Sequence, residues 1–223
     1  MATSGSSDFE LAVDDYIEEA FERCGLEIRT GYDLKTAKRS LNLLFADWAN
    51  RGLNRWTITQ TTTTITDGTT EYTLAADTID VLSAVIRENA GTSSQTDTAI
   101  TRIGRDTYLN ISSKLTESRP TQFYIDRQIV PKIRLYPTPN ATYSLVYDRL
   151  TRIEDADSAT NTVDVPFRFY PCLTAGLAYY LSIKKAPDRI TTLKAIYEEE
   201  FDRAATEDRD RTSLKLLPYE RYI

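Results

Sequence analysis

The chain has 223 residues, of which 27% are charged and 41% are apolar, and its formal net charge is −6. A chain of this length buries enough surface to fold without disulfides or a metal, and its composition is that of a globular protein. The sequence has no run rich in Lys and Arg, so it lacks the basic stripe with which proteins neutralise nucleic-acid phosphates. The absence of histidine excludes Ser-His-Asp and Cys-His nucleophile systems and removes the commonest metal ligand.

The N-terminal quarter of the chain predicts a disordered start followed by two helices. Residues 1–7 are small and polar, which is typical of a disordered terminus. Apolar residues then recur at spacings of three and four from Phe9 to Cys24, and again from Leu34 to Trp48. Gly25 follows the first stripe and suits a left-handed C-cap. We therefore expect a helical pair over residues 8–53.

The middle of the chain changes to β-branched chemistry. Residues 57–66 are rich in Thr and Ile, which disfavour helix because two groups on Cβ crowd the preceding turn. Asp67-Gly68 is a hairpin signal, with residues 71–74 as the expected return strand. A short helix is expected at 105–115. Further strands are predicted at 79–87, 98–103, 122–127, 132–136 and 143–149. The sequence thus predicts an antiparallel β module over 54–150.

Helical patterns return near the C-terminus. One apolar stripe follows Pro171, the break at Ala186-Pro187 ends it, and a second begins at Ile190. We expect these two helices, within 165–208, to pack on the pair at 8–53. The predicted fold class is α+β, mainly α: a helical bundle from N- and C-terminal helices, an inserted antiparallel β module and an extended C-terminal tail.

The last segment, 209–223, is unusually apolar for a tail. Disordered segments are poor in large apolar residues, so we expect this one to be buried, either on its own domain or on a partner. Its candidate docking residues are Leu214, Leu216, Leu217, Pro218, Tyr219, Tyr222 and Ile223.

Other reactive side chains favour structural interpretations. Cys24 and Cys172 lie in helix-like apolar patterns and are expected to be buried free thiols. The carboxylates of 14–22 and 198–200 are expected on solvated helix faces, although a glycosidase needs only two carboxylates. No Gly-rich phosphate loop, cofactor site, metal site or membrane span is expected, and the chain is not expected to be an enzyme.

Several segments, taken in order, resemble the head-to-tail adaptor proteins of podoviruses, also called tail accessory factors or head-completion proteins. The segments are 18–25 (EEAFERCG), 39–52 (RSLNLLFADWANRG), 119–124 (RPTQFY), 135–139 (LYPTP), 164–169 (DVPFRF), 176–180 (GLAYY) and 207–211 (EDRDR). The resemblance covers nearly the whole chain and is weakest at 57–74 and 89–98.

The resemblance implies a structural virion protein at the head–tail junction, made in the host cytoplasm and binding no membrane. Like its relatives it would form a ring of about twelve copies below the portal protein. The tail would dock on the portal, the nozzle or the tail spikes or fibres would bind below, and DNA would pass through without sequence recognition. Alternatives are a nozzle or tail-tube subunit, a glycan-binding module built on 54–150, or a cell-wall hydrolase.

Overall fold

The computed structural model describes residues 5–6, 9–52 and 55–209. The helices are α1 (Val13–Arg23), α2 (Gly31–Arg51), α3 (Arg105–Leu109), α4 (Tyr170–Lys185) and α5 (Ile190–Glu207), with 3-10 turns η1 (Arg55–Thr57), η2 (Phe167–Phe169) and η3 (Pro187–Arg189). The strands are β1 (Ile58–Ile65), β2 (Glu71–Thr73), β3 (Thr78–Glu88), β4 (Thr96–Arg102), β5 (Gln122–Asp126), β6 (Lys132–Tyr136) and β7 (Tyr143–Thr151). The described residues are 40% helix and 26% strand, so the fold is mixed α/β and the "mainly α" prediction was wrong.

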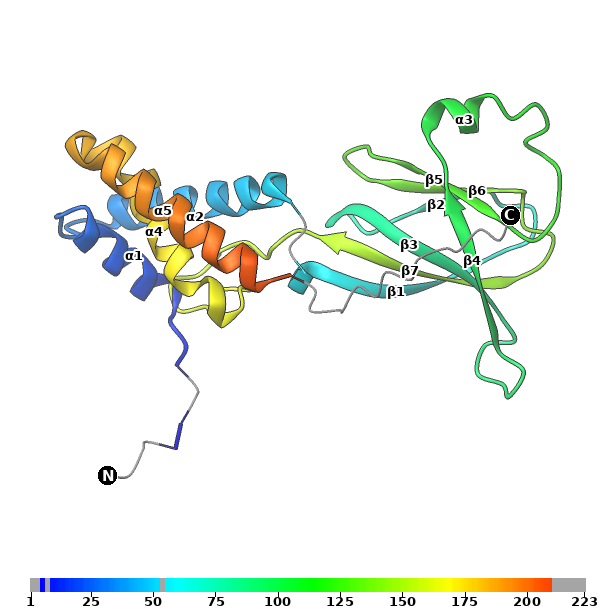
Figure 1. Cartoon of the computed structure of the whole chain (residues 1–223), viewed down its shortest axis with the longest axis horizontal. Coiled ribbons are helices and arrows are strands. Elements are labelled where there is room, and N and C mark those ends of the chain that lie inside the picture. The colour runs from blue at the N-terminus through cyan, green and yellow to red at the C-terminus, as the bar shows by residue number, and fades with distance from the viewer. Residues whose placement is uncertain (1–4, 7–8, 53–54, 210–223) are drawn as a thin grey trace, which may run out of the picture.

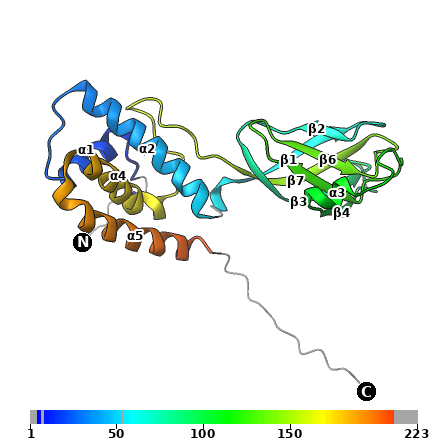
Figure 2. The ribbon, with the colours of Figure 1, turned by 90° about the horizontal axis from the view of Figure 1, so that it is seen from above.

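The structure has a helical lobe and a β lobe, joined by a neck (Figure 1). Each lobe has its own hydrophobic core, one built from the helices and the other from the strands. In the helical lobe α1, α2 and α5 all pack on α4, and Figure 2 shows α2 and α5 on opposite sides of it. Because α4 is covered on several sides, its sequence is apolar around most of its circumference.

One glycine permits the close packing around α4. A Cβ added at Gly176 would lie 2.9 Å from the Leu44 Cδ2 and 2.9 Å from the Tyr197 Cε2. Both of these side chains are fully buried, so neither has room to move away. Gly176 therefore lets α2 and α5 approach α4 more closely than any other residue would allow.

Polar groups also tie α2 to α5. The Trp48 indole N–H donates to the Tyr197 hydroxyl at 3.0 Å, and that hydroxyl donates to the Asp47 carboxylate at 3.2 Å. Arg51 pairs with Glu198 at 2.6 Å, and its hydrogen bond lowers the pKa of the Glu198 carboxyl. These bonds satisfy a buried indole and fix how the two helices meet.

The seven strands form one sheet in the order β1-β7-β3-β4-β5-β6-β2. Every pairing is antiparallel except β4 with β5, which is parallel, so the prediction of a wholly antiparallel module was wrong there. The connection that contains α3 carries the chain back before β5 begins, which is the crossover that a parallel pair requires.

The prediction of a hairpin at Asp67-Gly68 was wrong, because the two strands that flank the turn do not pair with each other. The turn is present, since Gly68 has a φ of 70° and Thr66 N–H donates to the Tyr72 hydroxyl at 2.8 Å. However, β1 pairs with β7 and β2 pairs with β6, at opposite edges of the sheet. The turn residues thus predicted the bend correctly, whereas contacts with distant segments of the chain determine which strands pair.

The predicted element positions needed smaller corrections. The first helix begins at Val13, so Phe9 lies before it, and the helix expected at 105–115 is only Arg105–Leu109. The strand expected at 98–103 starts two residues earlier, because β4 begins at Thr96. Within the described ranges no helix is long and apolar enough to cross a membrane.

Candidate functional site

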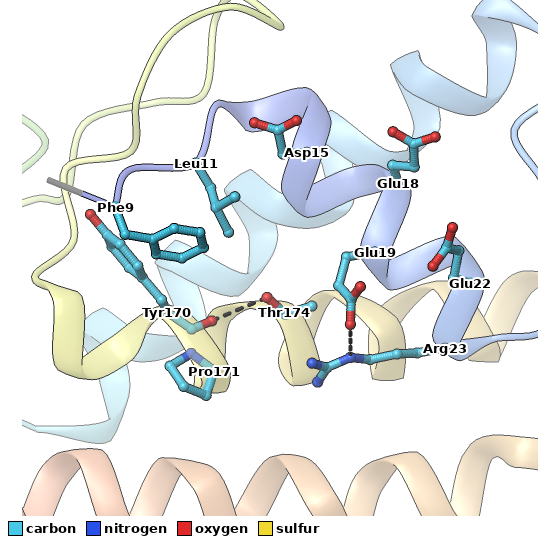
Figure 3. Close-up of a pocket in the computed structure, with 10 residues that line it drawn as sticks. All are labelled: Phe9, Leu11, Asp15, Glu18, Glu19, Glu22, Arg23, Tyr170, Pro171 and Thr174. Atoms are coloured by element: carbon cyan, nitrogen blue, oxygen red, sulfur yellow. Dashed lines mark hydrogen bonds and ion pairs between the residues drawn. The ribbon is translucent and has the colours of Figure 1, made fainter. Parts of the chain in front are cut away.

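The most distinctive surface feature is an open groove between α1 and α4, with a volume of about 460 Å³ (Figure 3). We call it the acidic groove. Residues on α1 and the segment before it form one wall, and the first turns of α4 form the floor. The lining residues are Phe9, Leu11, Asp15, Glu18, Glu19, Glu22, Arg23, Tyr170, Pro171 and Thr174.

The rim of the acidic groove is strongly negative. Asp15, Glu18 and Glu22 are all exposed along one side of α1. Arg23 is the only cation among the lining residues, and its guanidinium is already paired with Glu19 at 2.8 Å. The Asp15 carboxylate accepts a hydrogen bond from the Ala12 backbone N–H at 2.9 Å, whereas Glu18 and Glu22 are left to attract a basic partner.

The floor of the groove is aromatic. Phe9 is 63% exposed and lies beside Tyr170 (Figure 3). The Phe167 ring, 71% exposed, lies 5.7 Å from the Tyr170 ring and extends the patch along the chain. Contiguous exposed aromatic side chains with a polar rim are typical of a protein contact surface. The sequence had predicted Phe9 as a core residue of the first helix, and this was wrong because it precedes the helix.

A second, more apolar hollow of about 510 Å³ adjoins the first on the other side of α4, where α5 packs. Arg23 borders both hollows. The second is also lined by Ala175, Arg189, Thr192, Leu193 and Ile196. Ile196 belongs to the apolar stripe that begins at Ile190, but it is exposed at this hollow. Sequence periodicity placed it on the correct side of the helix without revealing that this side is only partly covered.

The neck contains a buried anchor at the end of α5. The Asp208 side chain is only 6% exposed and accepts hydrogen bonds from the Arg55 backbone N–H at 3.0 Å and from the Arg168 Nε at 3.0 Å. Beside it, the Trp56 indole N–H donates to the Asp164 carbonyl at 3.2 Å and its ring lies 4.5 Å from that of Phe169. Asp208 thus fixes the chain immediately before the tail.

The tail residues predicted from the sequence as docking residues lie outside the described ranges. They are Leu214, Leu216, Leu217, Pro218, Tyr219, Tyr222 and Ile223. The structure therefore places the start of the tail, at Asp208 in the neck, but not the tail itself. The acidic groove was not predicted, although the exposed carboxylates of 14–22 were; its aromatic floor comes from residues 167–171, distant in sequence.

The candidates for other chemistry have structural roles. Glu198 pairs with Arg51, and Glu199 and Glu200 pair with Arg203. Both cysteines are free and buried, and burial raises the pKa of each thiol, which makes them poor nucleophiles.

Three tyrosines of the β lobe are already buried or engaged within it. Tyr147 and Tyr108 are buried, and Tyr72 is engaged in the turn before β2. No cluster of potential metal ligands occurs within the described ranges.

An aromatic groove with a charged rim is typical of a surface that contacts another protein. The family model described as SU10 adaptor protein matches residues 9–217. The chain belongs to the SU10 adaptor protein family, and it is therefore a phage virion adaptor with a structural role. No curated protein matches the sequence.

Proposed function

We propose that this protein is the head-to-tail adaptor of a short-tailed phage, and that about twelve copies form a ring beneath the portal. The family match carries the proposal, since it extends beyond the end of α5 into the tail. In this proposal the tail docks on the portal, while the nozzle or the tail spikes or fibres bind the opposite side of the ring. DNA passes through the centre without being read.

The composition of the tail supports docking. Each large apolar side chain buried on a partner contributes about 1.5–3 kcal/mol, less the cost of ordering the segment. In a ring many such tails act together, and their effective concentration strengthens the assembly. The anchor at Asp208 supports the same proposal, because a tail that starts from a fixed point loses less freedom when it docks.

The charge of the protein supports unhindered passage of DNA. The net charge of the chain is −6. A negative lumen repels phosphates and so disfavours sticking of the DNA to the channel wall.

We further propose that residues 8–53 and 165–208 form one domain and residues 54–150 a second. Most of the first seven residues, expected from the sequence to be disordered, lie outside the described ranges.

Truncation after Asp210 tests the role of the tail. The shortened protein should remain folded by circular dichroism but lose binding to the portal ring of the same phage in native mass spectrometry. A full-length variant with Leu214, Leu216 and Leu217 changed to Ser should behave like the truncation, whereas a control with Thr212 and Ser213 changed to Ala should bind like wild type. Unchanged binding by the truncated protein would refute docking through the tail.

A further inference from the structure

A basic and apolar stripe runs along the outer side of α2, away from both hollows. Tyr32, Lys35, Arg39 and Leu43 are exposed, and their spacings of three and four residues place them in one line. Tyr32 is 74% exposed and Leu43 52% exposed. Neither Lys35 nor Arg39 has an ion pair with another residue in the described ranges. We call this line the α2 stripe.

The α2 stripe matches the acidic groove in charge and in spacing. Glu18 and Glu22 are one helical turn apart on α1, and Lys35 and Arg39 are one turn apart on α2. Two antiparallel helices can therefore bring Glu18 to Arg39 and Glu22 to Lys35 at the same time. The same register places Leu43 opposite Asp14, in the first turn of α1.

The two surfaces lie on different sides of the helical lobe. The acidic groove is lined by α1, by α4 and by residues before α1, and no residue of α2 lines it. In Figure 3 the groove opens toward the viewer while α2 lies behind α4. One copy cannot therefore join its own groove to its own stripe, whereas successive copies can do so repeatedly. Contacts between two different surfaces generate a ring when the rotation closes.

We infer that the acidic groove of one copy binds the α2 stripe of the next copy, and that this contact holds the adaptor ring together laterally. The inference rests on the proposed ring beneath the portal and adds the surfaces that meet within it. Each contact pairs two exposed carboxylates, Glu18 and Glu22, with two exposed cations, Lys35 and Arg39. Such charge pairs steer the approach of the two copies and fix the register of the two helices.

Charge reversal on each side tests the contact. A groove variant, E18K/E22K, and a stripe variant, K35E/R39E, change only exposed positions, so both should keep the melting temperature of wild type. Each should weaken lateral association at least about tenfold and give portals carrying scattered rather than complete sets of adaptors in native mass spectrometry. The quadruple variant should restore complete rings, as should an equal mixture of the two variants, because every contact in an alternating ring is then complementary.

Other outcomes are equally informative. Complete rings from both single-surface variants would overturn the contact. If the groove variant lost complete rings while the stripe variant kept them, the proposed contact would also be overturned. The groove would then be assigned to another occupant, such as the basic and apolar tail. Rescue by the quadruple variant is the result that a loss of tail binding could not produce.

Cross-linking separates this inference from the proposed function. In the double variant D14C/L43C, which places one thiol on each helix at the same level of the register, concentrated protein without portal should form disulfide-linked oligomers under oxidation, since the native cysteines are buried. D14C/I129C, whose second thiol lies on an exposed residue of the β lobe, serves as the control and should not. If wild type ignores the portal, the adaptor role fails; if D14C/L43C forms no oligomers, the contact fails whatever the portal does.

Discussion

Two buried tyrosines show how the contribution of a hydroxyl group to stability depends on its hydrogen-bond partners. The Tyr197 hydroxyl accepts from Trp48 and donates to Asp47, while the Tyr16 hydroxyl is buried without a partner among the described residues. Tyr197→Phe leaves the Trp48 N–H buried and unpaired, so we expect a loss of about 1–3 kcal/mol in the free energy of unfolding. Tyr16→Phe removes only an unsatisfied group, and we expect no loss or a gain of up to about 1 kcal/mol. Urea denaturation followed by fluorescence measures both.

Because the same Tyr→Phe substitution is made at two buried sites, each variant serves as a control for the other. Tyr32→Phe, at an exposed position, should change stability by less than about 0.5 kcal/mol. Equal losses at Tyr197 and Tyr16 would show that the ring environment rather than hydrogen bonding decides the effect. Sequence periodicity could not predict this difference between the two hydroxyls, because hydrogen-bond partners from distant segments cannot be read from spacing.

The start of α2 combines helix capping with a tertiary ion pair. Asp33 accepts from the Thr30 N–H at 3.2 Å and also pairs with Lys185 on α4. The hydrogen bond from Lys185 lowers the pKa of Asp33 from 3.8 to about 2. The carboxyl therefore binds a proton more readily in the unfolded chain, and its stabilising effect is complete above about pH 4 and lost as the pH falls toward 2.

Asp33→Asn should thus be less stable than wild type at neutral pH, and the difference should shrink as the pH falls from about 4 to 2. Urea denaturation at a series of pH values measures this difference. Lys185→Met, which removes the largest cause of the shift, should lose most of the same pH-dependent component. A difference between wild type and Asp33→Asn that stays constant down to pH 2 would contradict the assigned role.

Elements were easier to predict than their pairing. The β-branched run at 57–66, the apolar stripes of α2 and α5, and the turn at Gly68 all reflect local preferences that spacing reveals. Other features depend on where distant segments of the chain lie in the fold. They are the strand partners of β1 and β2, the parallel pair β4–β5 and the exposure of Ile196. The acidic groove belongs to this second group, because α1 supplies its rim and residues 167–171 supply its floor.

At the scale of the molecule, the neck determines how the two lobes are held. The cores are separate, and Asp208 links the turn that leads into the β lobe with the turn that leads into α4. In the role proposed above, with a portal on one side and a tail on the other, the adaptor needs these lobes in a fixed relation. Removing the Asp208 carboxylate leaves Arg168 and the Arg55 N–H without this acceptor, so the neck should loosen.

We expect Asp208→Ala to lower the free energy of unfolding by about 1–3 kcal/mol and to broaden the distribution of distances between the lobes. Spin labels on cysteines introduced at Lys194 and Ser93, both exposed, report that distribution, and the buried native thiols should remain unlabelled. Asp202→Ala, an exposed carboxylate on the same helix, is the matched control and should leave both quantities unchanged. A narrow, wild-type distribution in Asp208→Ala would mean that packing of Trp56 on Phe169 alone fixes the neck.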